Sequence, residues 1–108
     1  MGYAMWASVR DGILVGVRFD TTGVHEQDRV LNQLRDKFGQ PTSFNREPMQ
    51  NLLGMKFERY VAVWKGTQVY VEFNGVLDEI DYGLVSIETP AEHARRVRSL
   101  QESRPPKL

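Results

Sequence analysis

The side chains best able to carry chemistry in this 108-residue sequence are two histidines and a short run of carboxylates. His25 and His93 fall in two different expected helices, without carboxylates at ligand spacing, so a histidine metal site would need a coincidence of tertiary structure. An acidic turn carries Asp78, Glu79 and Asp81, but it lacks the spacing and the distal glutamate of a calcium loop. We therefore expect a solvated acidic turn, with no metal and no other cofactor.

The sequence also lacks the patterns that usually mark an enzyme. It has no cysteine, which excludes a thiolate nucleophile, a thiolate metal site and a disulfide framework. No serine stands in a nucleophile-elbow setting, and no glycine-rich loop precedes a helix to hold phosphate. We expect a protein that is not an enzyme.

Composition limits the class of protein and its partners. With 41% hydrophobic and 26% charged residues, the chain has an ordinary globular composition, and its length fits one domain. We place this domain at residues 1–103 and a frayed tail at residues 104–108. The 14 basic and 14 acidic residues cancel, which disfavours nucleic acid as a partner. Residues 1–19 alternate and contain charges, so they predict neither a signal peptide nor a membrane span.

The strongest local pattern is a β-hairpin over residues 55–73, in which apolar and polar residues alternate on both sides of Gly66. A two-residue loop would mix apolar and polar side chains on both faces. A three-residue loop pairs Val63 with Thr67 and Val61 with Val69, and it makes one face mostly apolar. We therefore expect the three-residue loop, with Val61 buried and Tyr70 on the polar face.

A second hairpin is expected over residues 3–19, closed by a three-residue loop that ends at Gly12. This register pairs Met5 with Val17 and leaves Trp6 on the other face beside Gly16. Burial of Trp6 against the chain is favoured over exposure. It is kept as a contact candidate.

The period changes to that of an amphipathic helix between Thr22 and Gly39, with Thr22 as its expected cap. Its apolar stripe should lie on the sheet. Residues 40–54 are punctuated by prolines and Gly54, which predicts a long connection with a short strand near residues 42–45. An ordered crossover pinned by Phe44, Met49 and Leu52 is favoured over a binding loop.

The chain is expected to finish with a strand over residues 84–88 and a helix over residues 89–102. Thr89 and Glu92 have the spacing of a capping box around Pro90. The helix is basic and its apolar stripe is thin, whereas residues 72–88 are acidic, so the two segments could attract one another within one molecule or across a dimer. A solvated basic face is favoured, because exposed ion pairs contribute little. The predicted fold is α+β: an antiparallel sheet of about five strands in the order ββα-(β)-βββ-α, with one amphipathic helix packed on a face and a C-terminal helix.

The middle of the chain also carries a pattern of motifs: LRDKFGQPTS from Leu34, NREPMQNLLGMKFERYVAVWKG from Asn45, then VYVEFNG and IDYG. It resembles a family of uncharacterised small domains from bacterial secreted or periplasmic proteins. The resemblance implies a helix, a polar linker, a strand ending in tryptophan, a hairpin and a final strand, and it assigns no catalytic residue. It implies a periplasmic or secreted location if an export signal has been removed. Otherwise we expect the chain to be cytoplasmic.

Two functions agree with these observations. The first is a non-enzymatic binding or accessory domain of the bacterial cell envelope, and the second is a small inhibitor or immunity-type protein that blocks a partner enzyme. We expect a protein partner and a monomer or weak homodimer that uses a sheet edge. The predicted contact surface is a polar-aromatic sheet face, although cover by the C-terminal helix is equally compatible with the sequence. Its residues are Glu58, Tyr60, Gln68, Tyr70, Glu72 and Trp6.

Overall fold

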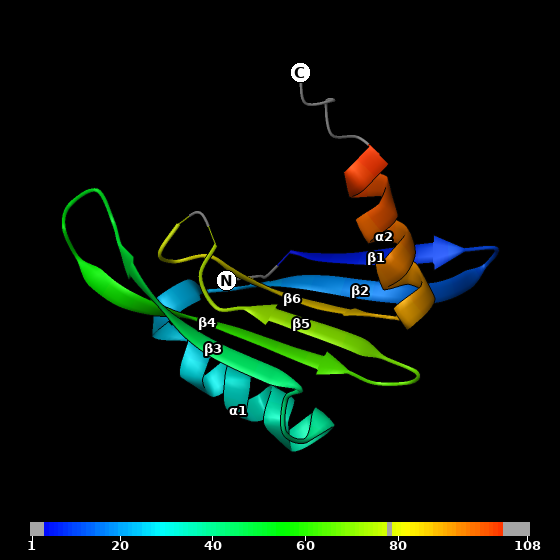
Figure 1. Cartoon of the computed structure of the whole chain (residues 1–108), viewed down its shortest axis with the longest axis horizontal. Coiled ribbons are helices and arrows are strands. Elements are labelled where there is room, and N and C mark those ends of the chain that lie inside the picture. The colour runs from blue at the N-terminus through cyan, green and yellow to red at the C-terminus, as the bar shows by residue number, and fades with distance from the viewer. Residues whose placement is uncertain (1–3, 78, 103–108) are drawn as a thin grey trace.

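A computed structural model describes residues 4–77 and 79–102, which form an open antiparallel sheet and two α-helices (Figure 1). The elements are β1 (Met5–Arg10), β2 (Ile13–Thr21), the 3₁₀ turn η1 (Gly23–His25), α1 (Gln27–Phe38), β3 (Ser43–Gln50), β4 (Lys56–Lys65), β5 (Tyr70–Asn74), β6 (Gly83–Glu88) and α2 (Pro90–Glu102). The strand order is β1-β2-β6-β5-β4-β3. The α+β class is confirmed, but the sheet has six strands instead of about five. The tail predicted at residues 104–108 lies outside the described residues.

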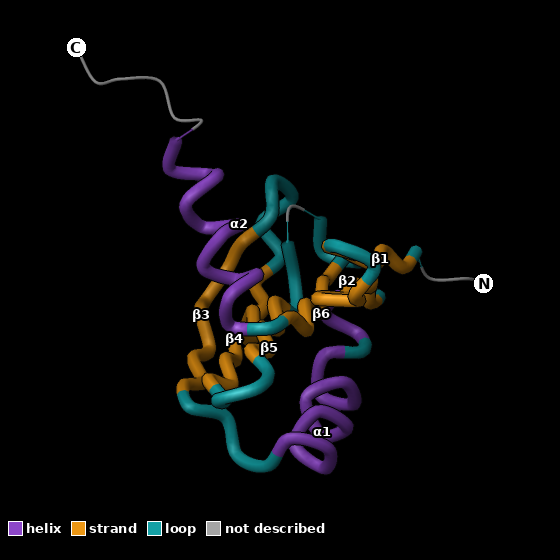
Figure 2. The backbone as a smooth tube through the Cα atoms, turned by 90° about the vertical axis from the view of Figure 1, so that its right-hand side faces the viewer, coloured by secondary structure: helices purple, strands orange, loops and turns teal. Residues whose placement is uncertain are grey.

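The two helices lie on opposite faces of the sheet (Figure 2). α1 packs on one face, where its Leu31 and Leu34 meet the central strands and complete the hydrophobic core. α2 leaves the end of β6 on the other face and projects away from the sheet (Figures 1 and 2). Neither helix of the described residues is long and apolar enough to span a membrane.

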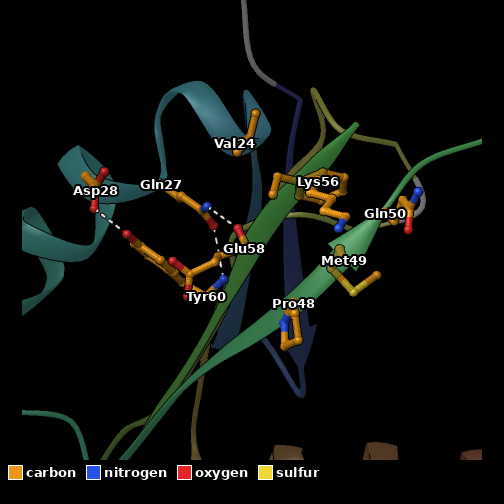
Figure 3. A pocket seen from close by; sticks show the side chains of 10 residues that line it. Val24, Gln27, Asp28, Pro48, Met49, Gln50, Lys56, Glu58 and Tyr60 are labelled. Carbon is orange, nitrogen blue, oxygen red and sulfur yellow. Dashed lines mark hydrogen bonds between the residues drawn. The ribbon is translucent and has the colours of Figure 1, made fainter. Parts of the chain in front are cut away.

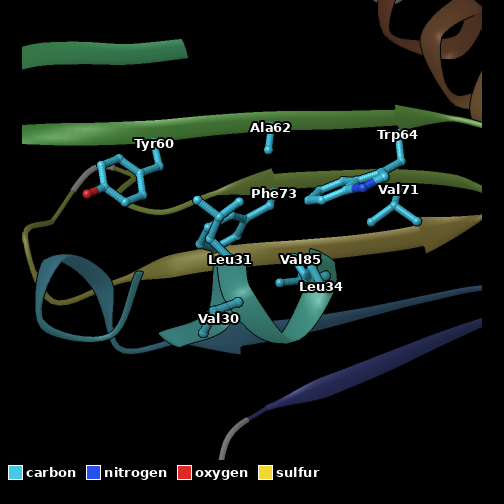
Figure 4. Packing of buried hydrophobic residues seen from close by; sticks show 9 residues of the cluster. All are labelled: Val30, Leu31, Leu34, Tyr60, Ala62, Trp64, Val71, Phe73 and Val85. Atoms are coloured by element: carbon cyan, nitrogen blue, oxygen red, sulfur yellow. The ribbon is translucent and has the colours of Figure 1, made fainter. Parts of the chain in front are cut away.

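The hydrophobic core lies between α1 and strands β4, β5 and β6 (Figure 4). Ala62, Phe73 and Val85 are completely buried, with 0% of their surface exposed. The buried cluster comprises Val30, Leu31, Leu34, Tyr60, Ala62, Trp64, Val71, Phe73 and Val85. No residue of α2 belongs to this cluster, so one helix carries the core and the other is attached at its surface.

The first hairpin has the predicted faces only over residues 5–8, and its loop is different. Arg10 pairs with Ile13 across a two-residue turn, and Asp11 and Gly12 both have positive φ, 52° and 77°. This is the backbone of a type I′ turn, whose twist matches that of the strands. Met5 pairs with Phe19 instead of Val17, and a bulge follows Ser8. From Met5 to Ser8 the shift is two residues, so these side chains keep their expected face. Beyond the bulge the shift is one residue, so Ile13 shares a face with Arg10 instead of Val9.

The predicted register of the central hairpin is wrong. Val63 pairs with Glu72 instead of Thr67, and a four-residue loop over 66–69 is closed by the Gly66 N–H donating to the Val69 carbonyl at 2.9 Å. The shift is an odd number of residues, so it reverses the face of one strand relative to the other. Val71 and Phe73 therefore lie beside Trp64 and Ala62 under α1. The prediction failed because it assumed one apolar face and one solvent-exposed face. In the structure most side chains on both faces of β4 are at least partly buried.

The connection predicted over residues 40–54 is mostly an edge strand, β3. Phe44 packs edge-on against Tyr60, with ring centroids 5.5 Å apart, as expected of a pinned crossover. Leu52 instead lies in the loop to β4 and is fully exposed. Pro48 is accommodated because, at an edge, its missing N–H points away from β4.

The helix starts differ in how well the sequence predicted them. Thr22 does not cap α1 with its side chain; its backbone N–H instead donates to the Glu26 carboxylate at 3.0 Å. Thr89 caps α2 as expected, because its Oγ1 accepts the Glu92 N–H at 3.1 Å. The Glu92 carboxylate does not complete a capping box, since it binds Arg10 and Arg95 instead.

Candidate functional site

The six residues predicted to form one contact face do not share a face. Glu58 and Tyr60 point toward α1, whereas Tyr70 and Glu72 lie on the side of the sheet that carries α2. Gln68 lies in the exposed loop between β4 and β5. The cause is the register error in the central hairpin. The polar-aromatic face is therefore corrected to two separate surfaces.

Tyr60 is a structural residue beneath α1. Its side chain is 9% exposed, and its hydroxyl donates a hydrogen bond to Asp28 Oδ1 at 2.7 Å (Figure 3). The hydrogen bond to Asp28, together with burial, raises the pKa of the Tyr60 hydroxyl above its usual value. The bond ties the first turn of α1 to β4, so it positions the helix and leaves little of the ring for a partner.

The side-chain amide of Gln27 replaces a missing strand beside β4. Strand β5 ends at Asn74, opposite Val61, so β4 has free peptide groups beyond this pair. Gln27 Oε1 accepts the Tyr60 N–H at 3.1 Å, and its Nε2 donates to the Glu58 carbonyl at 2.6 Å (Figure 3). These are the two hydrogen bonds that one residue of a parallel neighbouring strand would make with its own N–H and C=O.

Tyr70 is partly covered from the opposite side of the sheet by α2. The ring of His93 stacks on it with centroids 3.7 Å apart and an angle of 16° between the planes. Burial is the main reason that the pKa of Tyr70 lies above its usual value, and the charge of Glu72 adds to it. The expectation that α2 covers the contact face therefore holds for Tyr70 alone, because Tyr60 faces the other helix.

Charged groups attach α2 to the sheet. Glu88 of β6 binds Arg96 at 2.6 Å and the His93 Nδ1 at 3.0 Å. Glu92 binds both Arg95 and Arg10 of β1, each at 2.8 Å. The acidic segment and the basic helix are thus paired within one molecule through Glu88, whereas the sequence favoured a solvated face for the helix.

Four polar atoms on the α2 side of the sheet are buried without a hydrogen-bond partner among the described residues: Arg18 Nε, Asp20 Oδ1, Arg59 Nε and Ser86 Oγ. Ser86 lies opposite Arg18 on one side and Glu72 on the other. Its hydroxyl makes no hydrogen bond to Glu72 or to any other described residue. No group of three metal-ligating side chains occurs in the described residues either. His25 and His93 lie on different elements, and Asp78 of the acidic turn lies outside the described residues.

The β3–β4 arm is the feature that best fits a contact site. We use this name for the hairpin formed by β3, β4 and their connecting loop, residues 51–55, which extends beyond the end of β5 (Figure 1). The loop carries Leu52 and Leu53 on its surface, where they are 105% and 92% exposed. Isolated exposed leucines are common, but two adjacent and completely exposed ones at a protruding tip are unusual.

Asn51 fixes the conformation of this tip. Its Oδ1 accepts the N–H groups of Leu53 at 3.0 Å and Met55 at 2.9 Å. Its backbone carbonyl accepts the Gly54 N–H at 3.0 Å, and Gly54 has a positive φ of 87°. Asparagine commonly organises turns in this way, with glycine at the left-handed position. The two leucines are therefore held in a defined geometry.

Two clefts flank the β3–β4 arm. The larger has a volume of about 760 Å³ and lies between the arm and the start of α1, with polar lining from Gln27, Asp28 and Glu58 (Figure 3). The second, about 470 Å³, lies between the arm and the 76–80 turn, and Leu52 and Leu53 form part of its wall. A partner that binds the tip would have shaped surfaces on both sides of it.

Comparisons with protein-family models, with curated proteins and with solved structures found no match. The functional argument for this α+β domain is therefore based on its own geometry.

Proposed function

We propose that this chain is a non-enzymatic protein-binding domain that inserts the tip of its β3–β4 arm into an apolar pocket of a partner protein. The single observation that carries this proposal is the exposure of Leu52 and Leu53 on a loop whose conformation is defined by hydrogen bonds to Asn51. Burying two leucine side chains is worth about 3–6 kcal/mol. A preformed loop keeps most of this gain, because little conformational freedom is lost on binding.

A protein is a better partner for this tip than a membrane. The chain has no net charge, so it lacks an overall attraction to an anionic lipid surface. The cleft beside the arm offers Gln27, Asp28 and Glu58, which are hydrogen-bonding groups suited to the polar rim of a protein interface.

Two biological settings agree with a protein-binding tip. An accessory domain of the bacterial cell envelope is supported by the sequence resemblance alone. A small inhibitor or immunity-type protein is supported by the arm, because a rigid apolar loop can occupy the pocket of an enzyme. The identity of the captured partner distinguishes them: an envelope component supports the first and an enzyme inactivated by binding supports the second.

The test is affinity capture from the source organism with the intact chain and with the double variant Leu52→Ser, Leu53→Ser. We expect a partner to be lost from the double variant and kept by the control Leu100→Ser, which alters a leucine of α2 that is 59% exposed. Asn51→Ala should weaken the same complex by on the order of tenfold, because it loosens the tip without removing an apolar side chain. A partner that binds all variants equally would refute the proposal, and so would binding to neutral lipid vesicles that depends on the two leucines.

A further inference from the structure

The outer edge of β1 is a second surface, unrelated to the β3–β4 arm. β1 forms one end of the sheet, and its residues Met5, Trp6 and Val9 are 68%, 50% and 60% exposed. From Ala4 to Val9 the strand carries no charge, no proline and no lysine. Such an edge offers free backbone groups to another strand, and natural proteins usually block it.

The other edge of the sheet is blocked. On β3 the Asn51 N–H bonds to the Met55 carbonyl across the hairpin, so the odd-numbered residues direct their backbone groups toward β4. Pro48 falls among the outward-facing residues and removes an N–H from the free edge, and the charged Arg46 precedes it. Only β1, of the two edges, is open to pairing along its described length.

The outward-facing groups of β1 can be assigned from its register with β2. The Asp20 N–H donates to the Ala4 carbonyl at 3.1 Å, so the backbone groups of Ala4 point toward β2. Those of Trp6 and Ser8, two and four residues further along the strand, point the same way. Because the hydrogen-bonding direction alternates along an antiparallel strand, Met5, Ala7 and Val9 direct their N–H and C=O groups to the free edge.

We propose that two copies of this chain pair through β1, antiparallel and with a two-fold axis at Ala7, so that the two sheets become one. In this register Ala7 pairs with Ala7, and Met5 pairs with Val9, so every outward N–H and C=O of the three residues finds a partner. The spacing is self-complementary, as a two-fold interface requires. No other antiparallel register uses all three residues of both copies.

The side chains agree with this register. Trp6 comes to lie opposite Ser8 of the second copy. In that copy Ser8 pairs with Gly16 of β2, so Gly16 lies next beyond it. Two small residues leave room for an indole ring that is half exposed in the single chain. Arg10 comes opposite Ala4, so the interface brings no like charges together.

Proline substitution at the two edges provides a matched test. Ala7→Pro removes one outward N–H from β1, and Arg46→Pro removes one outward N–H from β3, which is already interrupted. By light scattering over a tenfold dilution, we expect the intact chain and Arg46→Pro to reach twice the monomer mass of 12.4 kDa at high concentration. Ala7→Pro should remain a monomer, while its circular dichroism shows a folded sheet. A monomeric intact chain, or a dimeric and folded Ala7→Pro, would overturn the proposal.

A cysteine cross-link tests the register itself. The chain has no cysteine, so a single introduced thiol can form a disulfide only with a second copy. Paired Cα atoms across such a strand pair lie about 5.5 Å apart, which suits a disulfide. Under mild oxidation Ala7→Cys should therefore dimerise at least tenfold faster than Ser99→Cys on α2. Equal rates would show that β1 is not the contact. The cross-link does not depend on Leu52 and Leu53, so a failure of the proposed partner binding at the tip would not change it.

Discussion

At the scale of single residues, a glycine and a glutamine together end the pairing between β4 and β5. A Cβ atom on Gly75 would lie 2.0 Å from Gln27 Oε1 and 2.9 Å from its Cβ. The Gly75 N–H donates to the Tyr60 carbonyl at 2.8 Å, next to the two bonds that the Gln27 amide makes. Glycine is thus required by the close approach of a buried side chain.

We expect Gly75→Ala to lower the free energy of unfolding by about 1–3 kcal/mol, because the added methyl group overpacks this contact. Gln27→Ala should also destabilise, since it leaves the Tyr60 N–H and the Glu58 carbonyl without partners. The double variant should lose less stability than the sum of the two single losses, because Gln27→Ala removes the closest contact, with Oε1, and leaves only the one with Cβ. Urea unfolding of the three variants measures this, and simple additivity would contradict the contact.

The carboxylate of Glu92 gives a residue-scale prediction on pH. Hydrogen bonds from Arg95 and Arg10 lower its pKa from 4.5 to about 2. For Glu88, burial opposes ionisation, but the bonds to Arg96 and His93 still hold its pKa below the usual value. A lowered pKa in the folded state means that the stabilisation is complete above pH 4.5 and is lost as the pH falls toward 2.

The difference in stability between the intact chain and Glu92→Gln should therefore be largest near about pH 5 and disappear near about pH 2. Thermal unfolding across this range measures it. Glu102→Gln removes the same charge from the exposed end of α2 and serves as the control. A difference that grows on acidification would mean that the Glu92 ion pairs do not hold α2 on the sheet.

At the scale of elements, the faces of the strands decide which substitutions the fold tolerates. Ala62 is completely buried beneath α1, whereas the adjacent Val61 is half buried on the α2 side. We expect Ala62→Asp to cost about 3 kcal/mol or more, because the carboxylate would lose its water under the helix. Val61→Asp should cost less than half of that. Chemical denaturation of both variants measures the two losses.

A larger loss for Val61→Asp than for Ala62→Asp would support the register predicted from the sequence, which buried Val61 and exposed Tyr70. In the structure these two residues lie on the same side of the sheet, so Tyr70→Ser should behave like Val61→Asp and be milder than Ala62→Asp. The three variants together therefore report the facing of the whole hairpin.

The two hairpins explain how far the sequence could predict the fold. Alternation of polar and apolar residues located both hairpins, and periodicity located both helices. In the first hairpin the loop differs from the prediction by one residue, which reverses Ile13 and Leu14, and the bulge after Ser8 restores the expected faces over residues 5–8. In the second hairpin the shift was odd, because the pattern over residues 66–69 does not reveal a four-residue loop. Periodicity alone cannot correct such an error when both faces of a strand are partly covered.

The candidate site was less predictable than the fold. The signal of the tip is present in the sequence, as an apolar pair that follows Asn51 and precedes Gly54 in an otherwise polar stretch. It was interpreted as an anchor for a crossover, because a leucine pair is usually buried. Only the length of β3 and β4 beyond β5 shows that Leu52 and Leu53 lie beyond the body of the sheet. The contact between Gln27 and β4 had no sequence signal other than its place in the apolar stripe.

At the scale of the whole molecule, the core and the second helix are separable. The buried cluster draws on α1 and the strands, and α2 meets the sheet through ion pairs and the ring of His93. Such partly exposed ion pairs contribute about 1 kcal/mol or less each. The sheet with α1 should therefore be the folding unit, and α2 should be an attachment to it.

We expect a chain that ends at Thr89 to fold and to melt roughly 4–8 °C below the full chain, which corresponds to about 1 kcal/mol. Trp64 is 5% exposed and donates its Nε1–H to the Gly39 carbonyl at 2.8 Å, so its fluorescence reports the packing of α1. In a Trp6→Phe background this emission should be unchanged by the truncation. Iodination of Tyr70 should become faster, because His93 no longer covers its ring.

Leu34→Asp in the full chain places a charge in the core and should unfold it, which supplies the matching control. If the truncated chain unfolds as Leu34→Asp does, α2 is part of the cooperative core and the division between the two faces of the sheet is wrong.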